Sequence, residues 1–206
     1  MPDATRAGRE PVTGPAPGRL EHVRAFVNTL DIEAGTDELD SPAVIADWLR
    51  SRELIPGPVS ATAGDLRRAV GLREALREVL SSHVGAGHGA GASLAGLRGL
   101  RAITDGLAAR LVIGDDGEVG TAPAGGAVAD GLAALMLIAA EASTLGTWQR
   151  LKVCGADDCR WAFYDRSPAR TGCWCSMAVC GSRAKSRAFR RRSAAAAGLT
   201  SDPARS

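Results

Sequence analysis

The feature that most constrains this chain is a cluster of cysteines near its C-terminus. The 206-residue sequence contains five cysteines, and all of them lie within the 27 residues from Cys154 to Cys180. Four of them form two pairs of equal spacing, Cys154-x4-Cys159 and Cys175-x4-Cys180, and fifteen residues separate the pairs. The two pairs can meet only if this short segment folds back on itself, so the spacing predicts a small compact module.

Two closely spaced pairs of cysteines joined by a loop can supply the four ligands of a tetrahedral zinc site. Disulfides are a poor alternative, because the number of cysteines is odd and we expect a reducing compartment. Free buried thiols are also a poor alternative, because the segment contains few aliphatic side chains. We therefore predict a structural Zn²⁺ ion, bound by Cys154, Cys159, Cys175 and Cys180 and closed to water. Cys173 is either a spare thiol, the interpretation that we favour, or a ligand in place of Cys175.

The rest of the sequence predicts a helical body. Apolar residues make up 45% of the chain, which is enough for a packed interior. Several segments have helical periodicity, whereas one run near residues 110–120, RLVIGDDGEVG, has the alternation and the Asp-Gly turn of a β-hairpin. The expected fold class is mainly α with one short β-hairpin: a helical N-terminal domain, then a small C-terminal four-cysteine zinc-binding module that ends in a basic helix.

The predicted organisation has four parts. Four prolines in the first 17 residues indicate a flexible leader. A glycine-rich stretch, GAGHGAG at 85–91, is expected to be a connector and lacks the GxGxxG spacing of a phosphate-binding loop. The predicted parts are a leader at 1–18, a helical domain at 19–147, a zinc module at 148–192 and a flexible tail at 193–206.

The charge of the chain is divided unevenly. Residues 150–192 carry eleven Lys/Arg against three Asp/Glu, a net charge of +8, whereas the rest of the chain carries −6. The run GSRAKSRAFRRR after Cys180 predicts a helix with Ser182 as its N-cap and most of its arginines on one face. Such a face suits contacts with phosphate and guanine. The predicted nucleic-acid contacts are Arg183, Lys185, Arg187, Arg190 and Arg191.

Two runs of residues, CGADDCRWAFYDRS at 154–167 and WCSMAVCGSR at 174–183, resemble the CGNR-type zinc finger found at the C-terminus of bacterial transcription regulators. Ser182 stands where that family has its name-giving Asn, and Cys173 stands at a position where a basic residue is expected. The N-terminal body, in FVNTLD at Phe26–Asp31 and DWL at Asp47–Leu49, resembles the ABATE domain, a stress-linked regulator. The resemblance implies that the four paired cysteines bind zinc and that Cys173 does not.

These features together predict a DNA-binding transcription regulator whose helical body senses a signal or dimerises. The alternative is a zinc-stabilised protein–protein interaction module without DNA binding. RNA binding is a third possibility, through base stacking on aromatic residues of the module. These aromatic residues are Trp161, Phe163, Tyr164 and Trp174.

We do not expect an enzyme. The polar residues Asn28, Asp31 and Asp37 could line a pocket, but such residues near helix ends more often form caps and turns. The longest apolar window, GLAALMLIAA, is too short to span a membrane, and the N-terminal residues lack the apolar core of a secretory signal. We therefore expect a cytoplasmic protein. Since one finger with few phosphate contacts binds DNA weakly, its partners should be duplex DNA and a second copy of the chain.

Overall fold

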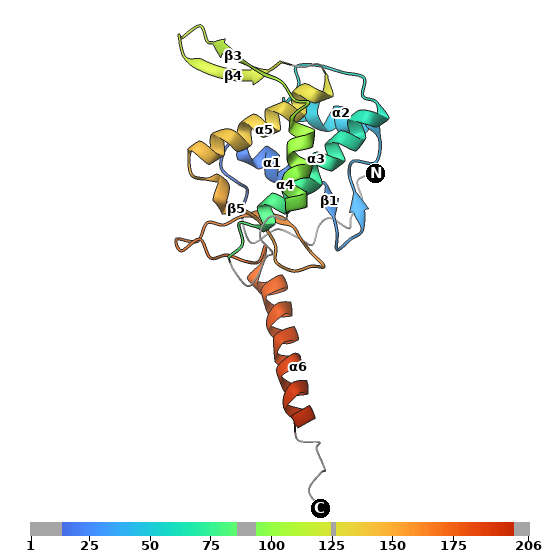
Figure 1. Ribbon diagram of the computed structural model, residues 1–206, viewed down its shortest axis with the longest axis vertical. Coiled ribbons are helices and arrows are strands. Elements are labelled where there is room, and N and C mark those ends of the chain that lie inside the picture. Colours follow the sequence, from blue (N-terminus) through green and yellow to red (C-terminus); the bar gives the residue numbers. More distant parts are fainter. Residues whose placement is uncertain (1–13, 86–93, 125–126, 200–206) are drawn as a thin grey trace, which may run out of the picture.

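The computed structural model describes residues 14–85, 94–124 and 127–199. Most of the predicted leader, the last seven residues of the predicted tail and all but Gly85 of the predicted glycine-rich connector lie outside these ranges. Within them the chain forms a helical body, a small cysteine-containing module below it, and one long helix that projects from the module (Figure 1). The mainly α fold class is confirmed.

Five helices form the body within the described residues (Figure 1). α1, α2, α3 and α5 each bury an apolar stripe against their neighbours, and α4 adds the half-buried Leu100 and Ile103. α5 is apolar on most of its surface, so the core forms around it. α5 also packs closely on α2, because a Cβ atom at Gly131 would lie 2.7 Å from a methyl group of Leu49. The helices are α1 (Leu20–Val27), α2 (Pro42–Ser51), α3 (Ala63–Ser81), α4 (Leu94–Thr104) and α5 (Val128–Thr144).

The predicted β-hairpin is present as β3 (Ala109–Ile113) and β4 (Val119–Pro123). Its turn contains Gly117 with a φ of 82°, a left-handed conformation that glycine adopts without a steric penalty. Two further antiparallel pairs were missed by the sequence prediction, because strands of two or three residues are too short to show an alternating pattern. They are β1 (Leu30–Asp31) with β2 (Thr36–Asp37), and β5 (Leu151–Val153) with β6 (Ala162–Tyr164).

The β5–β6 pair lies between the body and the cysteine module. It follows a 3₁₀ turn, η2 (Trp148–Arg150), and packs against α1 and α3. Side chains alternate along a strand, so the two faces of the pair have different neighbours. Phe163 on one face packs in the cysteine cluster. The other face contributes to the core of the body through Leu151, Val153, Ala162 and Tyr164.

The described end of the predicted leader is part of the folded body. Ala16 is buried in the core, and its backbone N–H donates to a carboxylate oxygen of Glu21 at 2.7 Å. The Arg166 side chain donates to the carbonyl oxygen of Pro15 at 2.6 Å. Residues 15 and 16, which the sequence assigned to the leader, therefore contact the folded part of the chain.

The basic helix differs from its prediction at both ends. A π-helical turn, η3 (Met177–Gly181), precedes α6 (Ser182–Leu199), and the Ser176 hydroxyl accepts a hydrogen bond from the Val179 N–H. The N-terminal cap is therefore Ser176 rather than the predicted Ser182. The helix continues beyond the predicted end at Arg192 because a run of alanines, which have the highest helix propensity, follows. No helix within the described residues is long and apolar enough to cross a membrane.

Candidate metal centre and basic helix

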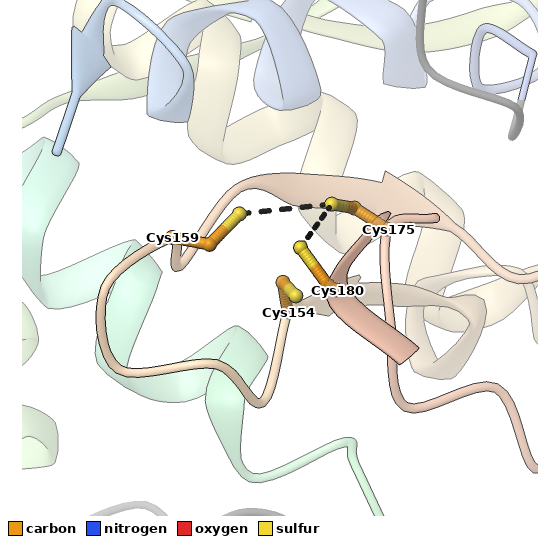
Figure 2. A group of neighbouring side chains, drawn as sticks. All are labelled: Cys154, Cys159, Cys175 and Cys180. Carbon is orange, nitrogen blue, oxygen red and sulfur yellow. Dashed lines mark hydrogen bonds between the residues drawn. The ribbon is translucent and has the colours of Figure 1, made fainter. Parts of the chain in front are cut away.

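Four cysteine side chains converge at the centre of the C-terminal module (Figure 2). The Sγ atoms of Cys159 and Cys175 are 3.6 Å apart, those of Cys175 and Cys180 are 3.7 Å apart, and all four lie within 4.8 Å of one another. Four sulfurs at about 2.3 Å from a central zinc ion would be about 3.8 Å apart. All four side chains are buried. The two predicted pairs therefore meet at a spacing that fits one tetrahedrally coordinated metal ion.

The cluster concentrates more thiols than can ionise together without a cation. Hydrogen bonds from Cys159 and Cys175, aided by the N–H groups of Cys175 and Ala156, lower the pKa of Cys154 to about 4. Hydrogen bonding to Cys154 raises the pKa values of Cys159 and Cys175, and burial raises that of Cys180. The Cys154 thiolate thus suppresses ionisation of Cys159 and Cys175, and burial suppresses that of Cys180. A bound divalent cation removes this conflict, because it favours all four thiolates.

Short backbone contacts bring the cysteines together. The Cys154 N–H donates to the carbonyl oxygen of Trp161 at 2.9 Å, which closes the first turn around its pair. The Gly155 N–H donates to the carbonyl oxygen of Cys173 at 2.9 Å, which places the second pair beside the first. The Cys173 thiol itself points elsewhere and donates to the Thr171 carbonyl oxygen at 3.2 Å. Cys173 is therefore outside the group of four.

A buried ion pair orders the loop that leads to Cys175. The Lys152 ammonium donates to Asp165 at 2.7 Å and to the carbonyl oxygens of Arg170 and Gly172. Asp165 also accepts from the N–H groups of Ser167 and Gly172. Burial alone would raise the pKa of Asp165. The hydrogen bonds to its carboxylate, above all that from Lys152, outweigh burial and lower this pKa to about 2. This pair was not predicted, since nothing in the sequence around Lys152 or Asp165 indicates that either side chain is buried.

Polar contacts also connect the module to the body. Asn28 exchanges two hydrogen bonds with the backbone of Ala162, at 2.7 and 2.9 Å. Arg77, a buried residue of α3, donates to the carbonyl oxygens of Val27 and Arg160. His83 contacts the carbonyl oxygen of Leu151 at 2.7 Å. The body and the module are thus joined at several points along β5, β6 and the loop between them.

The three polar residues considered for an enzyme pocket, Asn28, Asp31 and Asp37, each have hydrogen-bond partners. Asn28 holds β6, as described above. Asp37 forms a paired hydrogen bond with the buried Arg73, at 2.6 and 2.8 Å. Asp31 accepts from the Ala34 N–H at 3.0 Å, which stabilises the turn between β1 and β2.

The predicted nucleic-acid contacts all lie on α6, but they differ in their surroundings. Arg183 pairs with Glu33 of the body at 2.8 Å, and Arg187 pairs with Asp158 of the module at 3.4 Å. Lys185, between these two arginines, and Arg190 and Arg191, farther along the helix, are exposed, and no ion pair involves them within the described residues. A shallow groove runs along the face of α6 that carries Arg183, Arg187 and Arg190. Its other lining residues are Ala178, Val179, Ser182 and Ser186.

The aromatic residues of the module are mostly unavailable for base stacking. Phe163 and Tyr164 are buried. Trp161 and Trp174 are half-buried and pack against the cysteine cluster. These positions identify the four side chains as packing residues in the free protein.

A four-thiol site beside a basic helix, attached to a helical body, defines the class of zinc-finger proteins with an added helical domain. Comparison with protein families supports this and names both parts. The family model of the CGNR zinc finger matches residues 150–193. The ABATE family, described as a putative stress-induced transcription regulator, matches residues 21–147, more than half of the chain. The chain therefore belongs to the ABATE family and carries a CGNR zinc finger. The comparison with curated proteins gives no match.

Proposed function

We propose that this protein is a DNA-binding transcription regulator in which zinc, held by the four cysteines, fixes the start of α6. One observation carries the proposal. Cys180 lies in the π-helical turn directly before α6, and α6 then extends away from the body (Figure 1). A metal at the cysteines would therefore order the first turn of a helix whose later arginines, Arg190 and Arg191, are exposed to solvent.

The donor set supports zinc as the metal. Four sulfurs with tetrahedral spacing suit Zn²⁺, and a closed site of this kind has a structural role. Metal analysis of the purified protein should give one zinc per chain. The Cys175→Ser variant should lose it, whereas the Cys173→Ser variant should retain it. Equal retention by both variants would contradict the assignment of ligands.

The free arginines of α6 are the best candidates for phosphate contacts. Arg190 and Arg191 are exposed and have no carboxylate partner within the described residues. Arg183 and Arg187 must first exchange their ion pairs with Glu33 and Asp158 for phosphates. Water screens exposed ion pairs of this kind and they contribute little to stability, so the exchange is feasible.

The test is binding of the zinc-loaded protein to random duplex DNA, measured by fluorescence anisotropy over a series of salt concentrations. Each phosphate contact contributes about −0.9 to the slope of log K against log salt. The Arg190→Gln/Arg191→Gln variant should bind more weakly, with a slope smaller by about 2.

A matched control is available on the body, where Arg67 and Arg68 are exposed neighbours on α3. Arg67→Gln/Arg68→Gln makes the same change in net charge and should leave the slope unchanged. If both double variants weaken binding equally, α6 is not the DNA-binding surface, and only the net charge of the protein matters.

A protein partner is the second candidate for this surface. Met177 and Val179 on η3 and Phe189 on α6 are exposed apolar side chains, and phosphate contacts do not need them. If zinc-loaded protein does not bind DNA even at low salt, this candidate is favoured. In either case we propose that the protein acts by binding and not by catalysis.

A further inference from the structure

We infer that the β3–β4 hairpin is a dimerisation arm that packs against the same hairpin of a second copy of this chain. The hairpin extends from the helical body at the end opposite to α6 (Figure 1). β4 packs on α5 near the base of the hairpin, and most residues of both strands are exposed. This inference does not depend on the proposed DNA binding, because α6 takes no part in it.

One face of the hairpin is apolar and uncharged. Leu111 and Ile113 are two residues apart on β3 and therefore share a face, and Val119 lies directly opposite Ile113. Their exposed fractions are 75%, 76% and 68%. Thr121, opposite Leu111, and the Ala109–Pro123 pair complete this face without a charge. Contiguous exposed aliphatic side chains of this kind are characteristic of interaction surfaces.

The charges around this face are arranged to suit a second copy. The tip of the hairpin is acidic, and its residues are Asp115, Asp116 and Glu118. The base carries a net positive charge from Arg101, in the last turn of α4, and Arg110, the second residue of β3, with Asp105 as the opposing charge; all three residues are exposed. When two hairpins pack face to face in antiparallel directions, the acidic tip of each lies at the basic base of the other.

This arrangement has the two-fold symmetry of most homodimers, in which the same surface of each copy forms the interface. The uncharged faces meet without repulsion between like charges, and burying the aliphatic side chains supplies the driving force. The opposite charges at the two ends favour the antiparallel direction over the parallel one.

The first test is sedimentation equilibrium of the zinc-loaded full chain. Wild-type protein should be a dimer, and the Leu111→Thr/Ile113→Thr variant should dissociate with a dissociation constant at least about tenfold higher. Threonine keeps a high strand propensity, so the hairpin itself should persist. Leu145→Thr is the control, since Leu145 is 68% exposed outside the hairpin, and it should leave the dimer unchanged. A monomeric wild-type protein overturns the inference, as does a double variant that remains as dimeric as wild type.

The second test separates a second copy from any other occupant of the hairpin. Asp115→Lys/Asp116→Lys gives a hairpin that is basic at both ends, and Arg101→Glu/Arg110→Glu gives one that is acidic at both ends. Each variant alone should be mainly monomeric, and an equimolar mixture should form a heterodimer. A mixture that stays monomeric overturns the antiparallel packing of two hairpins.

Discussion

The two hydrophobic clusters of this molecule, one in the helical body and one in the cysteine module, consist of different kinds of side chain. The body has a large cluster of aliphatic and aromatic side chains contributed by α1, α2, α3 and α5. The cluster in the module consists mainly of four cysteines, with Ala156, Phe163 and two half-buried tryptophans around them. The body can therefore be stabilised by burial of apolar surface alone. The module has too little apolar surface for this and needs a metal ion.

The body and the module are not fully separate, because the β5–β6 pair contributes residues to both hydrophobic clusters. Its two faces contact the two clusters, and Asn28 of the body holds the backbone of β6. Loss of the metal should therefore unfold the loops around the cysteines and leave the strands beneath them attached to the body. The following changes test this contrast, from the largest expected effect to the smallest.

Replacing a cysteine of the group of four should have the largest effect. Structural zinc contributes roughly 10–16 kcal/mol of binding free energy in small modules, and Cys175→Ser removes one of four ligands. The fluorescence of Trp161 and Trp174 should shift toward that of exposed tryptophan, whereas the far-ultraviolet circular dichroism of the body should be largely retained. A variant that loses its whole helical signal would show that the body, too, depends on the metal.

Removing the carboxylate of the buried ion pair should be the next largest change. Asp165→Asn leaves Lys152 buried without an opposite charge, and the free energy of unfolding should fall by about 3–5 kcal/mol in urea titrations at neutral pH.

The effect of Asp165→Asn should depend on pH. The pKa of Asp165 is about 2 in the folded protein, below its unfolded value of about 3.9. The stabilisation is therefore fully present above pH ~4 and is lost as the pH falls toward 2. The difference in stability between wild type and Asp165→Asn should disappear over the same interval, and a difference that does not change with pH would contradict the ion pair.

A cavity in the body should destabilise the protein and spare the metal site. Leu135 of α5 is fully buried, so Leu135→Ala should lower the free energy of unfolding by about 2–5 kcal/mol. The zinc content of the folded protein should remain at one per chain. Loss of zinc from the variant while it is still folded would mean that the two clusters are not separate.

Removing one of the hydrogen-bonding side chains that join the body to the module should have the smallest effect. This change should affect both the stability of the body and the metal site of the module. Asn28→Ala leaves the N–H and the carbonyl group of Ala162 without their partner, at a cost of about 1–3 kcal/mol. Both the free energy of unfolding and the affinity for zinc, measured by competition with a chelator, should fall. Gln149→Ala, which removes an exposed amide, is the control and should change neither. An effect on stability without any effect on zinc affinity would show that β6 does not position the cysteines.

The sequence predicted the features that follow a regular spacing of residues. It did not predict which charged side chains are buried or which residues they contact. The spacing of the cysteines predicted which four would meet, and the alternating run with its Asp-Gly turn predicted the β3–β4 hairpin. The burial of Arg73 and Arg77 on α3 was not predictable, because their partners other than the neighbouring Glu74 are Asp37 and backbone carbonyl groups distant in sequence. The ion pairs of Arg183 and Arg187 escaped prediction for the same reason.

Hydrogen exchange of the full chain, with zinc and after chelation, tests the contrast between the two clusters most directly. With zinc, the backbone amides of residues 154–181 should be protected. After chelation these amides should exchange rapidly, while those of α1, α3 and α5 keep most of their protection. Equal loss of protection in both regions, or no loss in residues 154–181, would contradict the account of an apolar body that carries a metal-dependent module.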